Sequence, residues 1–265
     1  MKRLRQPENA IILTTYEQLA SYVGAFARGY INLVILVGSH GLSKSRTVRE
    51  ALPDACWIEG NASPFGIYQA LYRNRDRTIV MDDLDSLHKD HHGVRLLKAL
   101  CNTESTKTVG WHTATRVLER ANIPREFTTS SRVIIICNDW ATVNRNVAAL
   151  QDRGHLLSFQ PTAAEVHAKA AEWFDDAEIL EWFGENLDRV GEPSLRWYVK
   201  AQELKRSSLD WKQVIQLDPA SLRRKLVVEL IGDKSFATQE ERAREFSRRG
   251  GGCRATFFNH VRRVR

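Results

Sequence analysis

The residues with the clearest chemical potential form a short segment between an apolar run and a helical pattern. Residues 31–37 (INLVILV) lead directly into Gly38-Ser39-His40-Gly41-Leu42-Ser43-Lys44-Ser45. Small residues let successive backbone N–H groups point inward, and the start of a helix favours an anion. The segment therefore predicts a phosphate-binding loop. The alternative is an ordinary strand-to-helix turn that is rich in small residues.

A second group of polar residues ends another apolar run. Residues 78–81 (TIVM) are followed by Asp82 and Asp83, and Asp82 lies 38 positions after Lys44. Paired carboxylates at the end of a buried strand are expensive unless they meet a cation or polarise a water molecule. The pair therefore favours a metal or water site. The alternative is a capped helix start after a strand.

Three further polar side chains occur at positions that could complete such a site. Asn138 follows the apolar run 132–137 (RVIIIC), where an amide could bridge a phosphate and an attacking water molecule. Arg153 precedes a weaker apolar run, and Arg196 falls in the first turn of a predicted helix that Pro193 and Ser194 begin. Taken alone, each has a plainer interpretation: a turn residue for Asn138 and surface arginines for the other two.

The combined order of these residues resembles the AAA+ ATPases over roughly residues 16–210, with the initiator and helicase-loader branch nearest in character. Residues 38–45 resemble Walker A, 78–83 Walker B and Asn138 sensor 1. Arg153 resembles an arginine finger and Arg196 resembles sensor 2. The resemblance implies ATP and Mg²⁺ as cofactors, with Lys44 on the phosphates. It further implies Ser45 and Asp82 on the metal, Asp83 and Asn138 on the attacking water, Arg153 in a neighbouring subunit's site and Arg196 in a lid.

Two positions depart from the family pattern. Ser43 replaces the glycine that precedes the Walker A lysine, which could force a costly backbone φ or hinder the approach of phosphate. Asp83 stands where many such ATPases have glutamate, and its shorter side chain predicts slow hydrolysis.

The elements that must position these residues follow from the hydrophobic pattern. Five unalternating apolar runs separated by amphipathic segments predict an α/β domain over residues 1–161, with a five-stranded parallel sheet between helices. The five expected strands are 31–37, 56–58, 78–81, 132–137 and 156–159. Beyond Pro161 the strand signals end, and helical segments predict an all-α lid over residues 162–232.

The last segment, residues 233–265, combines two helical patterns with a glycine turn and a high positive charge. Residues 242–265 hold eight arginines against Glu245 alone, so they account for the whole net charge of +7. Such asymmetry is typical of nucleic-acid binding, and the pattern resembles a helix-turn-helix module. The expected DNA contacts are Arg254, Thr256, Asn259, Arg262 and Arg263. The alternative is a basic amphipathic helix that packs on the lid or on an RNA or protein partner.

A weaker hypothesis places DNA contacts between the second and third motifs, at Lys107, Trp111, His112 and Arg116. In that stretch AAA+ proteins often project loops toward nucleic acid.

Composition limits the remaining classes. The chain has 43% hydrophobic and 27% charged residues, which excludes disordered, collagen-like and coiled-coil classes. No apolar run approaches the length that a bilayer requires, and no export signal is recognised. The cysteines Cys56, Cys101, Cys137 and Cys253 are scattered, which favours free thiols in a reducing cytoplasm.

These observations predict an ATP-hydrolysing protein that acts on DNA in replication, transposition or another process of mobile DNA. The partners expected are DNA, further copies of the chain in a ring or filament, and a protein of a replication or transposition complex. The alternative is a nucleotide-gated DNA-binding regulator with little or no hydrolysis, which Ser43 and Asp83 favour. A small-molecule phosphotransferase is a third class, but the sequence has no evident acceptor site.

Overall fold

A computed structural model of the chain describes residues 9–83, 90–112, 116–138, 153–187, 192–214, 219–233 and 235–264, with the backbone only at 214, 219–222, 225, 263 and 264. The chain divides into two compact units, Met1–Thr162 and Ala163–Arg265. Within the described ranges, no helix combines the length and the apolar character that crossing a bilayer requires.

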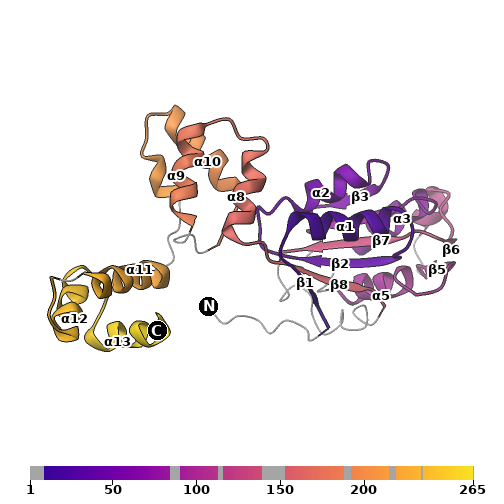
Figure 1. Ribbon diagram of the computed structural model, residues 1–265. Coiled ribbons are helices and arrows are strands. Elements are labelled where there is room, and N and C mark those ends of the chain that lie inside the picture. Colours follow the sequence, from indigo (N-terminus) through magenta and orange to yellow (C-terminus); the bar gives the residue numbers. More distant parts are fainter. Residues whose placement is uncertain are drawn as a thin grey trace. The chain divides into compact units, whose positions relative to one another are not determined.

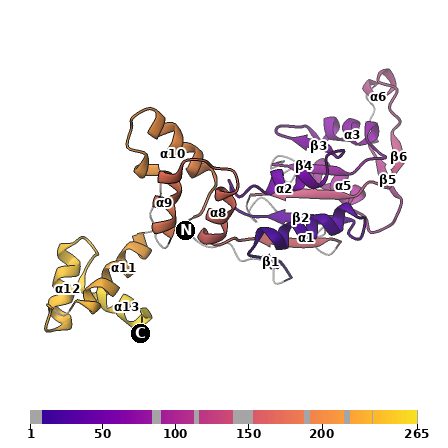
Figure 2. The ribbon, with the colours of Figure 1, turned by 45° about the horizontal axis from the view of Figure 1, so that its top comes forward.

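The first unit is built on a parallel sheet, shown in Figures 1 and 2. Its strands in spatial order are β1 (Ile11–Leu13), β8 (His155–Phe159), β2 (Leu33–Val37), β7 (Val133–Cys137), β4 (Ile79–Asp82) and β3 (Cys56–Glu59). Every neighbouring pair is parallel. All residues of β2 and β7 are buried, as expected for central strands that are covered on both faces.

The sheet has six strands, so the expected five-stranded sheet was wrong by one. The additional strand is β1, which pairs with β8 at the edge. It has three residues and its central Ile12 is 55% exposed, so it is too short for a hydrophobic pattern to reveal it. A separate antiparallel hairpin, β5 (Lys107–Gly110) with β6 (Glu126–Thr129), was also not predicted.

Helices cover both faces of the sheet. These are α1 (Tyr16–Ala27), α2 (Lys44–Ala51), α3 (Pro64–Arg73) and α5 (His91–Leu100), and the short α6 (Val117–Arg120) precedes β6. Leu33, Ile35 and Val37 share one core with Tyr68 of α3 and Leu97 of α5. Because side chains alternate along a strand, the residues between them face α1 and α2 on the other side. Figure 1 shows α1 and α2 on one face and α5 on the other.

The second unit is helical. Its first part contains α8 (Ala163–Ala171), α9 (Ala177–Glu185), α10 (Arg196–Arg206) and the 3₁₀ helix η2 (Trp211–Val214). The rings of Phe183 and Tyr198 stack with centroids 4.3 Å apart, and His167 Nδ1 lies 2.9 Å from the Tyr198 hydroxyl. These contacts join α8, α9 and α10.

The last three helices form what we call the C-terminal cluster: α11 (Pro219–Gly232), α12 (Gln239–Arg248) and α13 (Arg254–Val264). Its core consists of Val227, Leu230, Ala243, Phe246, Phe257 and Val261. Arg242 fixes the end of α11 by donating to the carbonyl oxygens of Leu230 (2.8 Å) and Phe236 (2.7 Å). The helix α11, which was expected within the 162–232 segment, thus shares its core with the helices after residue 233.

Candidate functional site

Three neighbouring strands place the predicted residues at one edge of the sheet. β7 lies between β2 and β4. Just beyond the strands, Gly38 N donates to Cys137 O and Asp83 N donates to Ile136 O, each over 3.3 Å. Asn138, the next residue after β7, therefore lies between the loop that follows β2 and the pair Asp82 and Asp83. Crevices at the carboxyl ends of parallel strands are the usual ligand sites of open α/β sheets.

The loop between β2 and α2 has the close approaches and backbone bends of a phosphate cradle. A Cβ on Gly38 would lie 2.6 Å from the carbonyl oxygen of Phe159, so only glycine fits there. Gly41 has φ 73° and Ser43 has φ 61°, both left-handed. The side chain of Ser43 makes no capping hydrogen bond to α2. The first amides of that helix are consequently positioned to bind an anion.

The side chain of Lys44 lies within this loop. Its side chain is buried, and its Nζ donates to the carbonyl oxygens of Gly38 (2.7 Å) and Ser39 (2.8 Å) and to Asn138 Oδ1 (3.1 Å). A buried ammonium group needs such oxygens around it. The same position lets the charge interact with an anion bound in the loop.

Asp82 and Ser45 form a pair suited to a divalent cation. Burial raises the pKa of Asp82, a hydrogen bond from the Ser45 hydroxyl lowers it, and the charges of Asp83 and Glu59 raise it again. The net effect is a raised pKa, so a positive ion beside the carboxylate would stabilise its charged form. Carboxylate and hydroxyl oxygens are ligands that Mg²⁺ accepts. Ser45 and Asp82 therefore fit a magnesium site.

Asn138 links the lysine to the second carboxylate. Its Nδ2 donates to Asp83 Oδ1, while its own Oδ1 accepts from Lys44 Nζ at 3.1 Å. Asp83 is exposed and has φ 54°, a left-handed conformation that is uncommon for residues other than glycine. Strained backbone of this kind is concentrated at functional sites. Lys44, Asn138 and Asp83 thus form one continuous hydrogen-bonded chain across the edge of the sheet.

One predicted residue of the first unit is not brought to this edge. Arg153 lies just before β8, at the amino end of the strands, and its Nη1 donates to Lys98 O of α5 over 2.6 Å. Arg196 belongs to the second unit, where it begins α10 with an exposed side chain.

Glu59 was not among the residues expected from the sequence. It ends β3 in register with Asp82, and its charge contributes to the raised pKa of that residue. Arg49 of α2 binds Glu59 at 2.7 Å and places its guanidinium 3.9 Å from the centroid of the Trp57 ring. The sequence signal for Glu59 was a carboxylate at the end of a short expected strand. That Glu59 lies beside Asp82 follows from the pairing of β3 with β4, which the sequence does not specify.

The glycine turn of the C-terminal cluster is tightly specified. Gly250 has φ 78° and Gly252 has φ 118°, so both adopt conformations that favour glycine. A Cβ on Gly251 would lie 2.4 Å from the ring of Phe246. Glycine is therefore favoured at 250 and 252 by the backbone conformation and at 251 by the lack of space for a Cβ.

The predicted DNA contacts divide into two groups. Arg254 Nε donates to Glu240 Oε2 over 2.8 Å, and Thr256 Oγ1 lies 3.3 Å from Cys253 Sγ, so both take part in contacts within the cluster. Asn259 and Arg262 are exposed. The side chain of Arg263 lies outside the described residues.

The weaker DNA-contact hypothesis was wrong for Lys107. This side chain is 3% exposed, and its Nζ donates to Ser131 O over 2.6 Å, because β5 turns it into the protein interior. Trp111 is partly buried, with its ring centroid 5.7 Å from that of Phe65 and 6.0 Å from that of Tyr68. Lys107 therefore presents no free basic group, and the Trp111 ring packs against aromatic neighbours.

Comparisons with known proteins show only partial similarity in sequence and structure. No protein-family model matches the chain. An uncharacterised 36.7 kDa protein from the nrdC–mobD intergenic region of Enterobacteria phage T4 is 33% identical over 120 residues, which cover 42% of this chain. The chain matches only 37% of the length of that phage protein.

Two solved structures show partial similarity. The FIGL-1 AAA domain has a TM-score of 0.38 and 14% identity, with 94% of this chain and 79% of that chain covered. Drosophila ORC bound to DNA has a TM-score of 0.32 and 12% identity, with 86% of this chain and 74% of that chain covered.

Proposed function

We propose that the chain is an AAA+ type protein that binds ATP with Mg²⁺ at the carboxyl edge of β2, β7 and β4, hydrolyses it and acts on DNA. The convergence of Lys44, Ser45, Asp82, Asn138 and Asp83 from three adjacent strands is the observation that carries the proposal. A lone glycine-rich turn would support nucleotide binding only weakly. Here the glycine-containing loop lies beside a lysine, an acidic pair and a bridging amide, and this combination supports phosphoryl chemistry.

In hydrolysis the side chains of this site position the phosphate and the attacking water molecule. Lys44 exchanges its bonds to the carbonyls of Gly38 and Ser39 for bonds to phosphate oxygens, aided by the first amides of α2. Asp83, held by Asn138, accepts a hydrogen bond from the attacking water molecule. Catalysis is then mainly positioning and charge stabilisation.

Ser45 and Asp82 would hold Mg²⁺, since their oxygens already lie together at the end of β4. The ion would neutralise phosphate charge as the bond to the leaving group breaks.

Arg153 and Arg196 would complete the site from outside this sheet edge. Because Arg153 lies at the opposite end of the strands, it would reach the nucleotide of a neighbouring copy, which implies a ring or filament. Arg196 would contact the nucleotide from a helical lid over residues 162–232, with residues 1–161 as the ATPase domain and 233–265 as the basic module.

The DNA part of the proposal is supported by charge. Residues 219–265 hold twelve basic against five acidic side chains, so the C-terminal cluster carries the net charge of the chain. Such a basic surface gains affinity by displacing counterions from phosphates. A role in replication, transposition or another process of mobile DNA, with a partner protein of such a complex, would follow.

The test is the rate of phosphate release by the full chain, with and without duplex DNA, for the natural sequence and Lys44→Ala. We expect ATP- and Mg²⁺-dependent release that DNA stimulates and that Lys44→Ala abolishes. If Lys44→Ala retains both nucleotide affinity and DNA-stimulated release, the proposal fails. Arg46→Ala is a matched control, because this neighbouring basic side chain is exposed and pairs with Glu50.

A second candidate function is a nucleotide-gated DNA-binding regulator with little or no hydrolysis. The left-handed Ser43 at the phosphate loop and the short Asp83 favour it. Turnover that is negligible with and without duplex DNA, and that rises in Ser43→Gly or Asp83→Glu, would support the regulator over the motor.

A further inference from the structure

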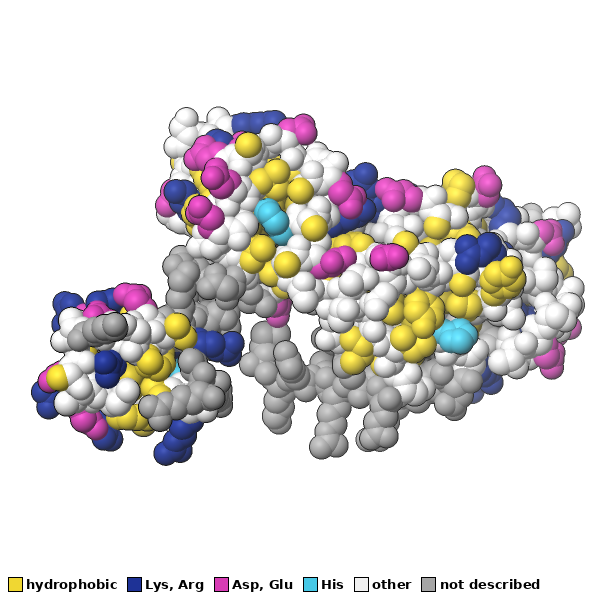
Figure 3. All heavy atoms as spheres, in the orientation of Figure 1, with side chains coloured by type: hydrophobic (Ala, Val, Ile, Leu, Met, Phe, Trp, Pro, Cys, Tyr) yellow, Lys and Arg dark blue, Asp and Glu magenta, His cyan; other side chains and the backbone are white. Residues whose placement is uncertain are grey.

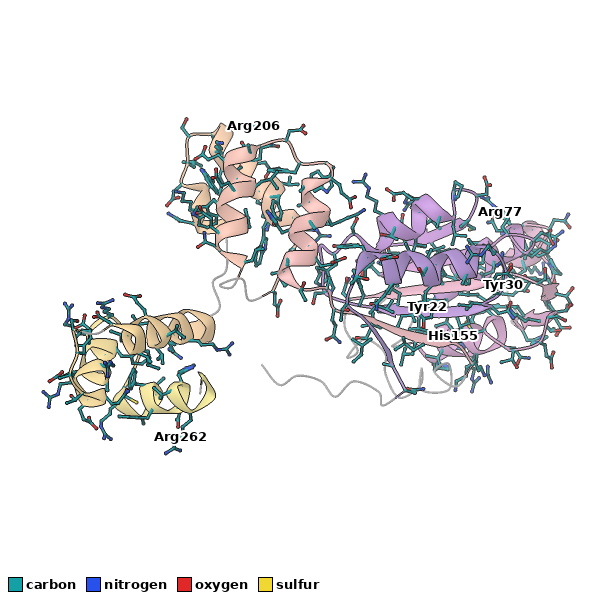
Figure 4. All side chains as sticks on the ribbon, viewed as in Figure 1. Tyr22, Tyr30, Arg77, His155, Arg206 and Arg262 are labelled. Carbon is teal, nitrogen blue, oxygen red and sulfur yellow. The ribbon has the colours of Figure 1, made fainter. Side chains whose placement is uncertain are left out.

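One face of α13 is exposed and differs chemically from the face that packs in the C-terminal cluster. Phe257 and Val261 are buried in the core, whereas Ala255, Asn259 and Arg262 are exposed. Their spacing of four and three residues places these three in one row along the helix. Figure 4 shows the Arg262 side chain extending away from the cluster.

Two neighbouring polar residues on α13 contact other residues of the C-terminal cluster. Arg254 Nε and Nη2 both donate to the Glu240 carboxylate of α12, and the guanidinium lies 4.9 Å from the centroid of the Phe258 ring. Thr256 contacts Cys253 in the preceding turn. Arg254 is also exposed, but its guanidinium is engaged by Glu240, which sets it apart from the row at 255, 259 and 262.

We propose that Ala255, Asn259 and Arg262 form a base-reading face that recognises a short sequence in the major groove of duplex DNA. The proposal rests on the DNA-binding function proposed above and deepens it. Asparagine pairs with adenine N6 and N7, arginine pairs with guanine O6 and N7, and a methyl side chain can contact the thymine methyl group. Each residue type in the row therefore has a base edge that it suits.

The length of the row matches a short DNA site. From residue 255 to residue 262 the helix rises about 10 Å at ~1.5 Å per residue. Base pairs follow one another about every 3.4 Å, so the row spans about three of them. The bases read should thus be contiguous or nearly so.

The net positive charge of the C-terminal cluster favours a nucleic acid as the occupant. Arg223, Arg224 and Arg244 are exposed on α11 and α12. Figure 3 shows Lys and Arg side chains distributed around the C-terminal helices. Phosphate contacts of this kind orient a protein on DNA, whereas base contacts supply sequence preference. A duplex is favoured over a single strand because a major groove admits one helix face.

The test is selection of duplexes from a library with a randomised central segment, using the full chain. The selected duplex is then bound by the natural sequence and by Asn259→Ala, Arg262→Ala and Arg244→Ala, with the far-ultraviolet circular dichroism of each variant as a fold control. We expect a motif with an adenine and a guanine within about three base pairs. Asn259→Ala and Arg262→Ala should each relax preference at one position by about 10-fold, while Arg244→Ala weakens selected and scrambled duplexes equally.

The outcomes separate this proposal from the one on which it rests. Salt-dependent duplex binding without an enriched motif would overturn the base-reading face and leave DNA binding intact. An enriched motif that Asn259→Ala and Arg262→Ala do not relax would also overturn it. If no duplex binds at low salt, DNA binding itself fails, and the base-reading face fails with it.

Discussion

At the scale of single residues, the loop between β2 and α2 has a left-handed residue that is not glycine. Ser43 has φ 61°, in a region where a side chain costs about 1–2 kcal/mol. We predict that Ser43→Gly raises the free energy of unfolding by about 0.5–1 kcal/mol, after the greater flexibility of glycine in the unfolded chain is deducted. Urea denaturation followed by circular dichroism measures this change.

Ser208 provides the matched control, since it has φ 55° and lies in the second unit, just after α10. Ser208→Gly should raise the free energy of unfolding by a similar amount without changing ATP affinity. Ser43→Gly should change both the free energy of unfolding and the ATP affinity. A loss of stability in Ser43→Gly would show that the left-handed loop is not a feature of the folded chain.

Asn138 is the second residue-scale test, because it bonds to both Lys44 and Asp83. Asn138→Ala removes the group that orients Asp83 and leaves the loop amides and Lys44 in place. We predict a fall in phosphate release of about 100-fold with ATP affinity changed only a few-fold. Single-turnover kinetics and nucleotide titration measure the two quantities; a variant that hydrolyses ATP normally would remove Asn138 from the mechanism.

At the scale of elements, the turn between α12 and α13 sets the orientation of the basic helix. A Cβ on Gly251 would press on the Phe246 ring at 2.4 Å, and this ring is fully buried. We predict that Gly251→Ala destabilises the cluster by about 1–3 kcal/mol, lowers DNA affinity and leaves ATP binding unchanged. Amide hydrogen exchange in α13 is the direct measurement.

Gly232→Ala is the control for that turn, because nothing lies within 4 Å of a Cβ there. Exchange in α13 should be unaltered in this variant. Equal protection of α13 in Gly251→Ala and Gly232→Ala would contradict the packing of the turn.

The element pattern was predictable where a strand is long and wholly apolar. β2 and β7 each have five buried residues, and their β-branched runs identify central strands from the sequence. β1 has three residues and β5 alternates over only four, so neither differs enough from a loop to be recognised. Short elements depend on pairing with distant segments, which periodicity does not record.

The candidate site was predictable where its residues belong to one local motif, but not where it depends on the packing of distant segments. Lys44, Ser45 and Asp82 follow from local motifs, and the conformational demand on Ser43 follows from its place in the loop. The packing of Gly38 on Phe159 depends on β8 lying beside β2. Similarly, the engagement of Arg254 with Glu240 depends on how α12 and α13 pack, so the sequence alone counted Arg254 as a free basic group.

At the scale of the whole molecule, the positive charge is concentrated in the C-terminal cluster and residues 1–218 are neutral overall. We predict that duplex affinity falls steeply as salt rises, because bound arginines release counterions. Arg244→Ala should lower the slope of log K against log salt by about 1. Fluorescence anisotropy across a salt series measures it. Arg206→Ala, an exposed arginine at the end of α10, should leave the slope unchanged; an equal effect would contradict the assignment of the surface.

Assembly is the second whole-molecule test. If Arg153 completes the site of a neighbouring copy, mass in solution should rise when ATP and DNA are added. Arg153→Ala and Lys44→Ala should each be inactive alone, yet a mixture of the two should regain activity, because some interfaces then combine an intact loop with an intact arginine. No recovery on mixing, with both variants folded, would contradict a role for Arg153 across an interface.

The most direct measurement of the central claim is calorimetric titration of ATP into the full chain with Mg²⁺, with chelator in place of Mg²⁺, and into the Lys44→Ala variant. We expect one ATP per chain, weaker binding without the metal and loss of binding in Lys44→Ala. An ATP affinity that neither the chelator nor Lys44→Ala alters would contradict the claim.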